Sequence, residues 1–146
     1  MKRAYDDIAK EVDAITDDLG LPIDAGIKKV VIALRLWNFP TDGSCEGHLS
    51  NGLPYPWVEI YAPEQEETSW RQENIHQRER LTRLLSDFYK TGKFKHRFTC
   101  QNIGMFGGFR LISEQTSNTS KPNANSINAQ RQDFDSFADF LVDNLQ

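Results

Sequence analysis

The chain has 146 residues, a size typical of a single domain. Its 17 basic and 21 acidic residues give a net charge of −4, and this lack of basic excess argues against general nucleic-acid binding, which depends on displacing counterions. No stretch approaches about 18 uninterrupted apolar residues, so we expect a soluble, cytoplasmic protein without a membrane segment. Two cysteines, Cys45 and Cys100, are too few for a disulfide scaffold.

Two helices and a strand are expected in the first half of the chain. Apolar residues recur at steps of three and four over residues 3–19, which predicts an amphipathic helix ended by Gly20. A second helix is expected over residues 25–38, with Asp24 as its N-cap. Residues 57–62 alternate in character between two prolines and predict a strand.

The second half continues with a helix and two strands. A hydroxyl side chain, that of Thr68 or Ser69, can cap a long helix over residues 70–90 whose apolar face includes Ile75. Residues 94–100 predict a second strand, and residues 105–112 predict a third. The glycines in and before this third strand suggest a bulge or a close backbone neighbour.

A polar segment separates the third strand from the last helix. Residues 114–127 are rich in Ser, Thr and Asn and predict a mobile surface loop. The last helix has an apolar face, which is wide enough to contact a second copy in a homo-oligomer and consists of Phe134, Phe137, Phe140, Leu141 and Leu145. The order α-α-β-α-β-β-α predicts one α+β domain over residues 1–146, with a small, largely antiparallel three-stranded sheet packed by about four helices.

Chemically capable side chains gather on one turn between an apolar helix and an apolar strand. It reads Pro-Thr-Asp-Gly-Ser-Cys-Glu-Gly-His over residues 40–48, and its glycines and proline fix unusual backbone angles or let a ligand approach the main chain. Hydroxyls such as those of Thr41 and Ser44, beside the amide of Gly47, are what a phosphate cradle contains. The sequence therefore predicts a functional site at this turn.

Several chemistries are open to the turn. Cys45 can act as a nucleophile with His48 as its base. Glu46 and His48 can form an acid–base pair, contact a ligand, or satisfy backbone groups of the turn. His96 and Cys100 complete a zinc-like set of residues, but four positions along a strand separate them by roughly 13 Å. Cys45, His48 and one of these two residues could still form a metal site. The predicted set of site residues contains no metal ligand, and we predict no cofactor.

Aromatic and arginine side chains flank the turn. Trp57 and Tyr55 can pack in the core or form a stacking platform for a ring. Arg35 and Arg110 are isolated charges in apolar surroundings, so each either pairs with a carboxylate or binds an anion. Basic residues also concentrate over residues 71–97, which favours a local anion site if they share one face.

The turn resembles two groups of proteins. Thr-Asp-Gly-Ser-Cys-Glu-Gly-His over residues 41–48, with Pro-Trp-Val-Glu-Ile over residues 56–60, resembles the Thr-x-x-Ser-Cys-x-Gly-His turn and Pro-aromatic strand of small phage and bacterial proteins of uncharacterised function. Ser44-Cys45-x-Gly47 resembles the Ser-Ser-Cys-x-Gly-Arg turn of the wybutosine-synthesis family, which methylates modified tRNA, with His48 in place of that Arg. Both resemblances imply an α+β fold with its site at the turn.

These features predict a binding protein for a small anionic, nucleotide-like molecule, rather than an enzyme. The expected ligand-binding residues are Arg35, Thr41, Ser44, Cys45, Glu46, Gly47, His48, Tyr55, Trp57 and Arg110. The phage resemblance implies a protein that sequesters a host nucleotide signal. One alternative is an enzyme on a nucleotide-like substrate, with His48 and Glu46 as acid and base and Cys45 as nucleophile. Another is a protein-interaction module that inhibits a partner through the turn.

Overall fold

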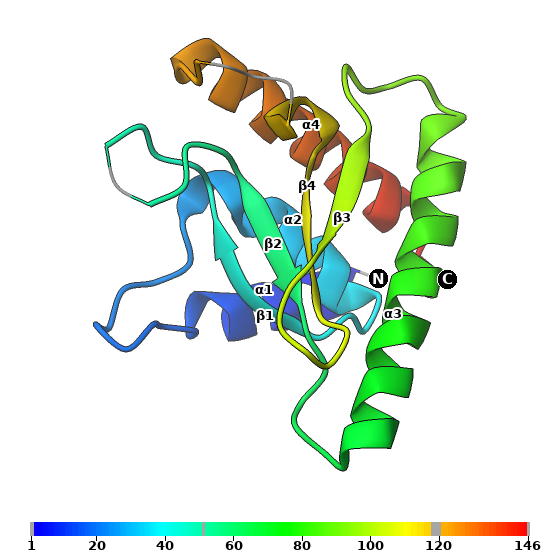
Figure 1. The fold of residues 1–146 in the computed structure, drawn as a ribbon. Helices are drawn as coiled ribbons and strands as arrows, with labels where there is room; N and C mark the ends of the chain where they lie inside the picture. Colours follow the sequence, from blue (N-terminus) through cyan, green and yellow to red (C-terminus); the bar gives the residue numbers. More distant parts are fainter. Residues whose placement is uncertain (1, 51, 118–120, 146) are drawn as a thin grey trace.

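The computed structural model describes residues 2–50, 52–117 and 121–145 (Figure 1). Within these ranges the chain forms four α-helices, four strands and one short 3-10 helix. In chain order they are α1 (Lys2–Asp13), α2 (Ala25–Leu36), β1 (Thr41–Cys45), β2 (Trp57–Ile60), α3 (Glu67–Tyr89), β3 (Phe98–Asn102), β4 (Phe109–Ser113), η1 (Glu114–Ser117) and α4 (Ala124–Asp143).

The predicted α+β class is confirmed, but the prediction of a three-stranded sheet is wrong. The sheet has four strands in the order β1-β2-β4-β3, and all neighbouring strands are antiparallel. The additional strand is β1, which occupies the first part of the predicted turn. No helix in the described ranges is both long enough and apolar enough to cross a membrane.

The register of the sheet divides its side chains between two faces. Val58 pairs with Leu111 and both are fully buried in the core, whereas Glu59 pairs with Arg110 on the opposite face. Helices α2 and α4 lie on the core side of the sheet, and α3 runs beside β3 (Figure 1). Trp57 shares the face of Glu59, because side chains two positions apart along a strand point the same way. Trp57 therefore lies outside the core, and of its two predicted positions the packing in the core is not the one observed.

Aromatic rings fill the contact between the helices and the sheet. Phe137 lies with its ring centroid 5.2 Å from that of Phe88, and Phe134 lies 4.8 Å from Phe98. Phe134 and Phe137 are fully buried, so the apolar face of α4 belongs largely to the core of the monomer. The expected homo-oligomer loses this support and stays a prediction.

Helix α1 ends at Asp13, six residues before the predicted end. The Asp17 carboxylate accepts hydrogen bonds of 2.9 Å from the amides of Leu19 and Leu21, and Thr16 forms an isolated bridge with Pro22. A side chain that bonds to nearby amides competes with the helix in this way. The chain between α1 and α2 therefore forms a loop in which Leu19 is 84% exposed.

Helix α3 begins earlier than predicted and has a different cap. The Glu66 carboxylate accepts from the amides of Thr68 and Ser69, so the prediction that one of these hydroxyl residues is the cap is wrong. Ile75, expected on the inner face, is 53% exposed.

The β3–β4 hairpin is displaced along the chain relative to the prediction. Strand β4 begins at Phe109 rather than at residue 105, because Gly104 and Gly107 adopt positive φ angles in the connection between the two strands. The backbone at Gly108 has the close neighbour that the glycines of this segment suggested. It is the Tyr61 ring, which would lie 2.2 Å from a Cβ atom at this position. Strand β3 likewise starts at Phe98 rather than at residue 94.

Both ends of the loop predicted over residues 114–127 are helical. Residues 114–117 form η1, and α4 begins at Ala124 with a capping box between Asn123 and Ser126. Residues 118–120, in the middle of the predicted loop, lie outside the described residues.

Candidate functional site

A cleft of about 340 Å³ lies between the loop after α1 and the edge strand β1. It brings together Arg35 from α2, Thr41 and Ser44 from β1, and Trp57 from β2. These four residues are part of the predicted ligand set, although three different elements carry them. The far wall consists of residues 15–17 and 21–24, which the sequence analysis did not include.

Gly43 allows the Trp57 indole to lie close to β1. A Cβ atom at this position would lie 3.4 Å from the Trp57 ring and 3.2 Å from the Glu59 carboxylate. The β1–β2 register is irregular between Thr41 and Gly43, so β1 carries a local distortion beside the cleft. A larger side chain at this position would therefore contact both the indole and the Glu59 carboxylate, and the carboxylate would have to move slightly.

Arg35 is anchored by the strand that it faces. Its Nε donates to the Thr41 hydroxyl at 2.7 Å and its Nη2 donates to the Thr41 carbonyl at 3.1 Å. A guanidinium has five N–H groups, so this anchoring positions the group and leaves donors for a ligand. Arg35 and Thr41 also line a neighbouring hollow of about 540 Å³ whose other wall includes Trp70.

Carboxylates outnumber cations in the cleft. Asp17, Asp24 and Asp42 line it, whereas Arg35 is its one cationic side chain among the described lining residues. An anion in this cleft would therefore depend on the Arg35 guanidinium to offset the nearby carboxylates.

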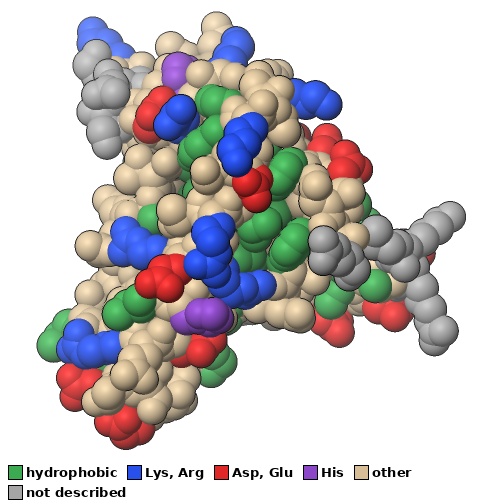
Figure 2. All heavy atoms as spheres, turned by 90° about the vertical axis from the view of Figure 1, so that its right-hand side faces the viewer, with side chains coloured by type: hydrophobic (Ala, Val, Ile, Leu, Met, Phe, Trp, Pro, Cys, Tyr) green, Lys and Arg blue, Asp and Glu red, His purple; other side chains and the backbone are tan. Residues whose placement is uncertain are grey.

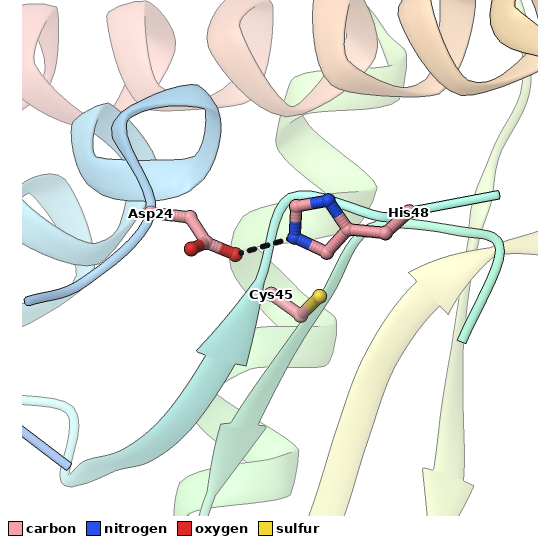
Figure 3. A group of neighbouring side chains, drawn as sticks. All are labelled: Asp24, Cys45 and His48. Carbon is pink, nitrogen blue, oxygen red and sulfur yellow. Dashed lines mark hydrogen bonds and ion pairs between the residues drawn. The ribbon is translucent and has the colours of Figure 1, made fainter. Parts of the chain in front are cut away.

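Asp24 has a different role from the one predicted. Within the described residues, its carboxylate caps no amide of α2. It accepts instead from the Glu46 amide at 3.1 Å and lies 3.2 Å from Nε2 of His48 (Figure 3). The Glu46 carboxylate in turn accepts a 3.4 Å hydrogen bond from the Gly26 amide in the first turn of α2. Glu46 thus accepts from an amide in the first turn of α2, as the N-cap residue Asp24 was expected to do, while Asp24 accepts from the Glu46 amide.

Cys45 lies beside this pair at the end of β1. Its Sγ accepts from the Gly47 amide at 3.3 Å. Burial raises the pKa of the Cys45 thiol, the Gly47 amide opposes this rise, and the negative charge of Asp24 adds to it. The thiol is therefore protonated at neutral pH, which weakens the prediction that Cys45 acts as a nucleophile.

Arg131 on α4 holds the turn in place and was not among the residues predicted for the site. Its Nε donates to the Glu46 carbonyl at 2.7 Å and its Nη2 donates to the Gly47 carbonyl at 2.9 Å. Nη2 also lies 3.3 Å from the Glu46 carboxylate. Glu46 therefore pairs with Arg131 and Gly26 while His48 pairs with Asp24, so the two residues expected as an acid–base pair have separate partners. Arg131 is 85 positions from Glu46, and no local pattern marks it.

Gly47 joins the two sides of the β1–β2 connection. Its φ is +89°, and a Cβ atom would lie 2.8 Å from the Tyr55 carbonyl carbon. The next residue, His48, donates its amide to the Leu53 carbonyl at 3.1 Å. Tyr55 thus supports the turn through its backbone and is not among the residues that line the cleft.

Arg110 contacts Trp57 from β4 and does not line the cleft. Its guanidinium lies 4.2 Å from the centroid of the indole ring, and its Nη2 lies 3.9 Å from the Glu59 carboxylate. Burial raises the pKa of the Glu59 carboxyl, and Arg110 lowers it in part. Arg110 was expected either to pair with a carboxylate or to bind an anion, and in the structure it pairs with the Glu59 carboxylate.

The basic residues over 71–97 do not form one continuous basic surface. Figure 2 shows the face that carries α3, where lysine and arginine side chains lie among acidic side chains and an apolar area. Arg71 pairs with Glu67, and Arg80 donates to the Trp37 carbonyl while its guanidinium lies 4.4 Å from the centroid of the Phe39 ring. Arg80 therefore holds α3 to the residues after α2, whereas the ion pair of Arg71 lies within α3.

The fold and the site together define an α+β protein with a small cleft at the free edge of its sheet. The chain matches no known protein-family model, no curated protein and no solved structure. The resemblance to phage proteins and to the wybutosine-synthesis family thus stays a prediction.

Proposed function

We propose that the protein binds a small anionic, nucleotide-like ligand in the cleft between residues 15–24 and β1. The observation that carries this proposal is the meeting of a guanidinium, two hydroxyls and an indole in one cleft, from Arg35, Thr41, Ser44 and Trp57. A volume of about 340 Å³ lies within the range of roughly 300–1,000 Å³ typical of small-molecule sites.

Each group has a defined part in this binding mode. Arg35 meets a phosphate or carboxylate, since its guanidinium is held by Thr41 and can donate two parallel hydrogen bonds. The Ser44 hydroxyl contacts a polar group of the ligand. The Trp57 indole contacts its ring, and Arg110 restricts the motion of the indole from the side of β4.

Binding without turnover is supported by the surroundings of the two groups that catalysis would need. Glu46 pairs with Arg131 instead of His48, and burial raises the pKa of the Cys45 thiol, which disfavours the thiolate. We propose, as the finer part of this function, that the protein sequesters a host nucleotide signal. That part rests on the resemblance of the turn to phage proteins.

Native mass spectrometry of protein purified from cells, followed by denaturing release of bound molecules, tests the proposal. We expect a nucleotide-like anion released chemically intact, with occupancy lost in Trp57→Leu and Arg35→Met. Lys29→Met is the matched control, because Lys29 lies on α2 and pairs with Asp139 outside the cleft.

Three results would contradict the proposal. Occupancy that survives both cleft substitutions would place the ligand elsewhere. A chemically altered ligand would favour the enzyme. An empty protein would favour the protein-interaction module.

A further inference from the structure

We propose that Asp24, Cys45 and His48 form a binding site for a divalent transition metal ion, with Zn²⁺ as the best fit. Asp24 precedes α2, Cys45 ends β1, and His48 lies in the β1–β2 connection (Figure 3). One oxygen, one sulfur and one nitrogen from these side chains all lie within 4.8 Å of one another. The sequence pattern offered only His96 and Cys100 as partners for Cys45 and His48, whereas in the structure the third donor is Asp24.

The three side chains converge on one point rather than forming a relay. The Asp24 carboxylate lies 3.2 Å from Nε2 of His48, and Figure 3 shows the other ring nitrogen on the far edge of the imidazole, away from Asp24 and Cys45. A Cys-His-Asp relay needs the two ring nitrogens to face different partners. Donor atoms that meet on one side of the imidazole instead have the arrangement of ligands around one ion.

The donor set selects the type of ion. Thiolate, imidazole and carboxylate are the three side-chain donors that bind Zn²⁺, at roughly 2.0–2.3 Å. Mg²⁺ and Ca²⁺ prefer oxygen donors alone, so a thiol and an imidazole disfavour them. Three protein ligands leave the fourth tetrahedral position for water or another ligand. Binding replaces the S–H bond of Cys45 with an S–Zn bond and releases the proton to solvent.

The backbone already supports the donors of this site. The Gly47 amide donates to Cys45 Sγ at 3.3 Å, and the Glu46 amide donates to the Asp24 carboxylate at 3.1 Å. Arg131 fixes the carbonyls of the same two residues, Glu46 and Gly47. Such outer contacts orient metal ligands in known sites. The turn is therefore built to hold its donors in place.

Asp24 connects this site to the cleft, because it is the one donor of the three that also lines the cleft. A divalent ion beside Asp24 would offset the excess of carboxylates there and favour an anionic ligand. This link rests on the proposed function, whereas binding of the metal ion itself does not.

Titration with Co²⁺ as a spectroscopic substitute for Zn²⁺ tests the site. We expect a sulfur-to-cobalt charge-transfer absorption that saturates with one ion per chain and is abolished when Zn²⁺ is added. Cys45→Ser should abolish the charge-transfer band, and His48→Gln should weaken binding by roughly 100-fold or more, since even outer-contact losses cost about 10–100-fold. Cys100→Ser is the matched control, because Cys100 lies on β3 away from the cluster.

Three outcomes would overturn the inference: no charge-transfer band in the wild-type protein, a band that depends on Cys100, or unchanged affinity in His48→Gln. The His48 side chain is 43% exposed, so this variant should fold, and circular dichroism checks that it does. The titration uses Co²⁺ and Zn²⁺ without a nucleotide. A negative result would therefore overturn the metal site but would not decide whether the protein binds a nucleotide, which mass spectrometry tests separately. Bound Co²⁺ without a nucleotide-like ligand would contradict the proposed function only.

Discussion

At the scale of single residues, the site depends on contacts that join distant parts of the chain. The Asp24 carboxylate accepts from the Glu46 amide, and the Glu46 carboxylate accepts from the Gly26 amide. Arg131 donates to the carbonyls of Glu46 and Gly47. Each of these bonds links α2 or α4 to the β1–β2 connection. The position of His48 and Cys45 beside Asp24 is a consequence of this network.

Arg131→Ala should lower the free energy of unfolding by about 2 kcal/mol, because it removes a charged donor from two half-buried carbonyls. Arg131→Lys should fall between the wild type and Arg131→Ala, since an ammonium keeps the charge near Glu46 but lacks the planar fork. Urea denaturation measures both. An unfolding midpoint in Arg131→Ala equal to that of the wild type would show that the clamp contributes nothing.

The pKa of Glu59 gives a prediction with a definite sign. Burial raises it above the ordinary value of 4.5, Arg110 opposes this rise, and Asp42 adds to it. Because the folded-state pKa is the higher one, the contribution of Glu59 to stability is present below the unfolded-state pKa and is lost as pH rises through the folded-state pKa. Glu59→Gln should therefore gain stability relative to the wild type as pH rises from acid to neutral.

Urea denaturation of both proteins across this pH range provides the measurement. A stability difference that stays constant with pH would show that Arg110 cancels the effect of burial at Glu59. A difference that moves in favour of the wild type as pH rises would show that Arg110 outweighs burial.

At the scale of elements, the β1–β2 hairpin decides where the site lies. Strand β1 pairs with β2 from Thr41 to Cys45, and the connection that follows folds back through Gly47. The hairpin places Trp57 across Gly43 and brings Cys45 to Asp24.

Gly47→Ala tests how tightly this connection is packed. An alanine there needs φ near +89° and places its Cβ 2.8 Å from the Tyr55 carbonyl carbon. Gly20→Ala is the matched control, because its φ is +79° and its Cβ would meet no heavy atom within 4 Å among the described residues. The control should lose about 1 kcal/mol from the backbone angle, and Gly47→Ala should lose at least about 1 kcal/mol more from the clash. Equal losses in thermal unfolding would mean that the clash relaxes freely.

Sequence periodicity located the helices and β2 because these elements bury one continuous face. It missed β1, because the residues Thr41–Cys45 include Asp, Gly and Ser, which are poor strand formers. This segment forms a strand only by pairing with β2. It predicted the turn as the site and four of the residues in the cleft. It could not find Asp24 or Arg131 in their actual roles, because contacts 24 and 85 positions apart leave no local pattern.

At the scale of the whole molecule, one aromatic core ties the helices to the sheet. Phe88 of α3, Phe98 of β3 and Phe137 of α4 lie with ring centroids 5.2–6.4 Å apart. These contacts fix α4 against the sheet, and α4 carries Arg131 to the turn. The site therefore depends on a core that is remote from it.

Phe137→Ala should destabilise the protein by about 3–5 kcal/mol, because the ring is fully buried among other aromatic rings. Ile75→Ala should change stability by no more than about 0.5 kcal/mol, since this α3 side chain is 53% exposed. Denaturant unfolding compares the two. A mild effect of Phe137→Ala would show that α4 is not bound through this core.

The location of the ligand in the cleft is tested most directly by the indole N–H signals in a nitrogen–proton NMR spectrum. The indoles of Trp37 and Trp70 donate to the carbonyls of Leu141 and Ala62, whereas Trp57 lines the cleft. Titration with adenosine and guanosine monophosphate, with inorganic phosphate as comparison, should shift the Trp57 signal and leave that of Trp37 unchanged. A nucleotide that binds while the Trp57 signal stays still would contradict the assignment of this cleft as the ligand site.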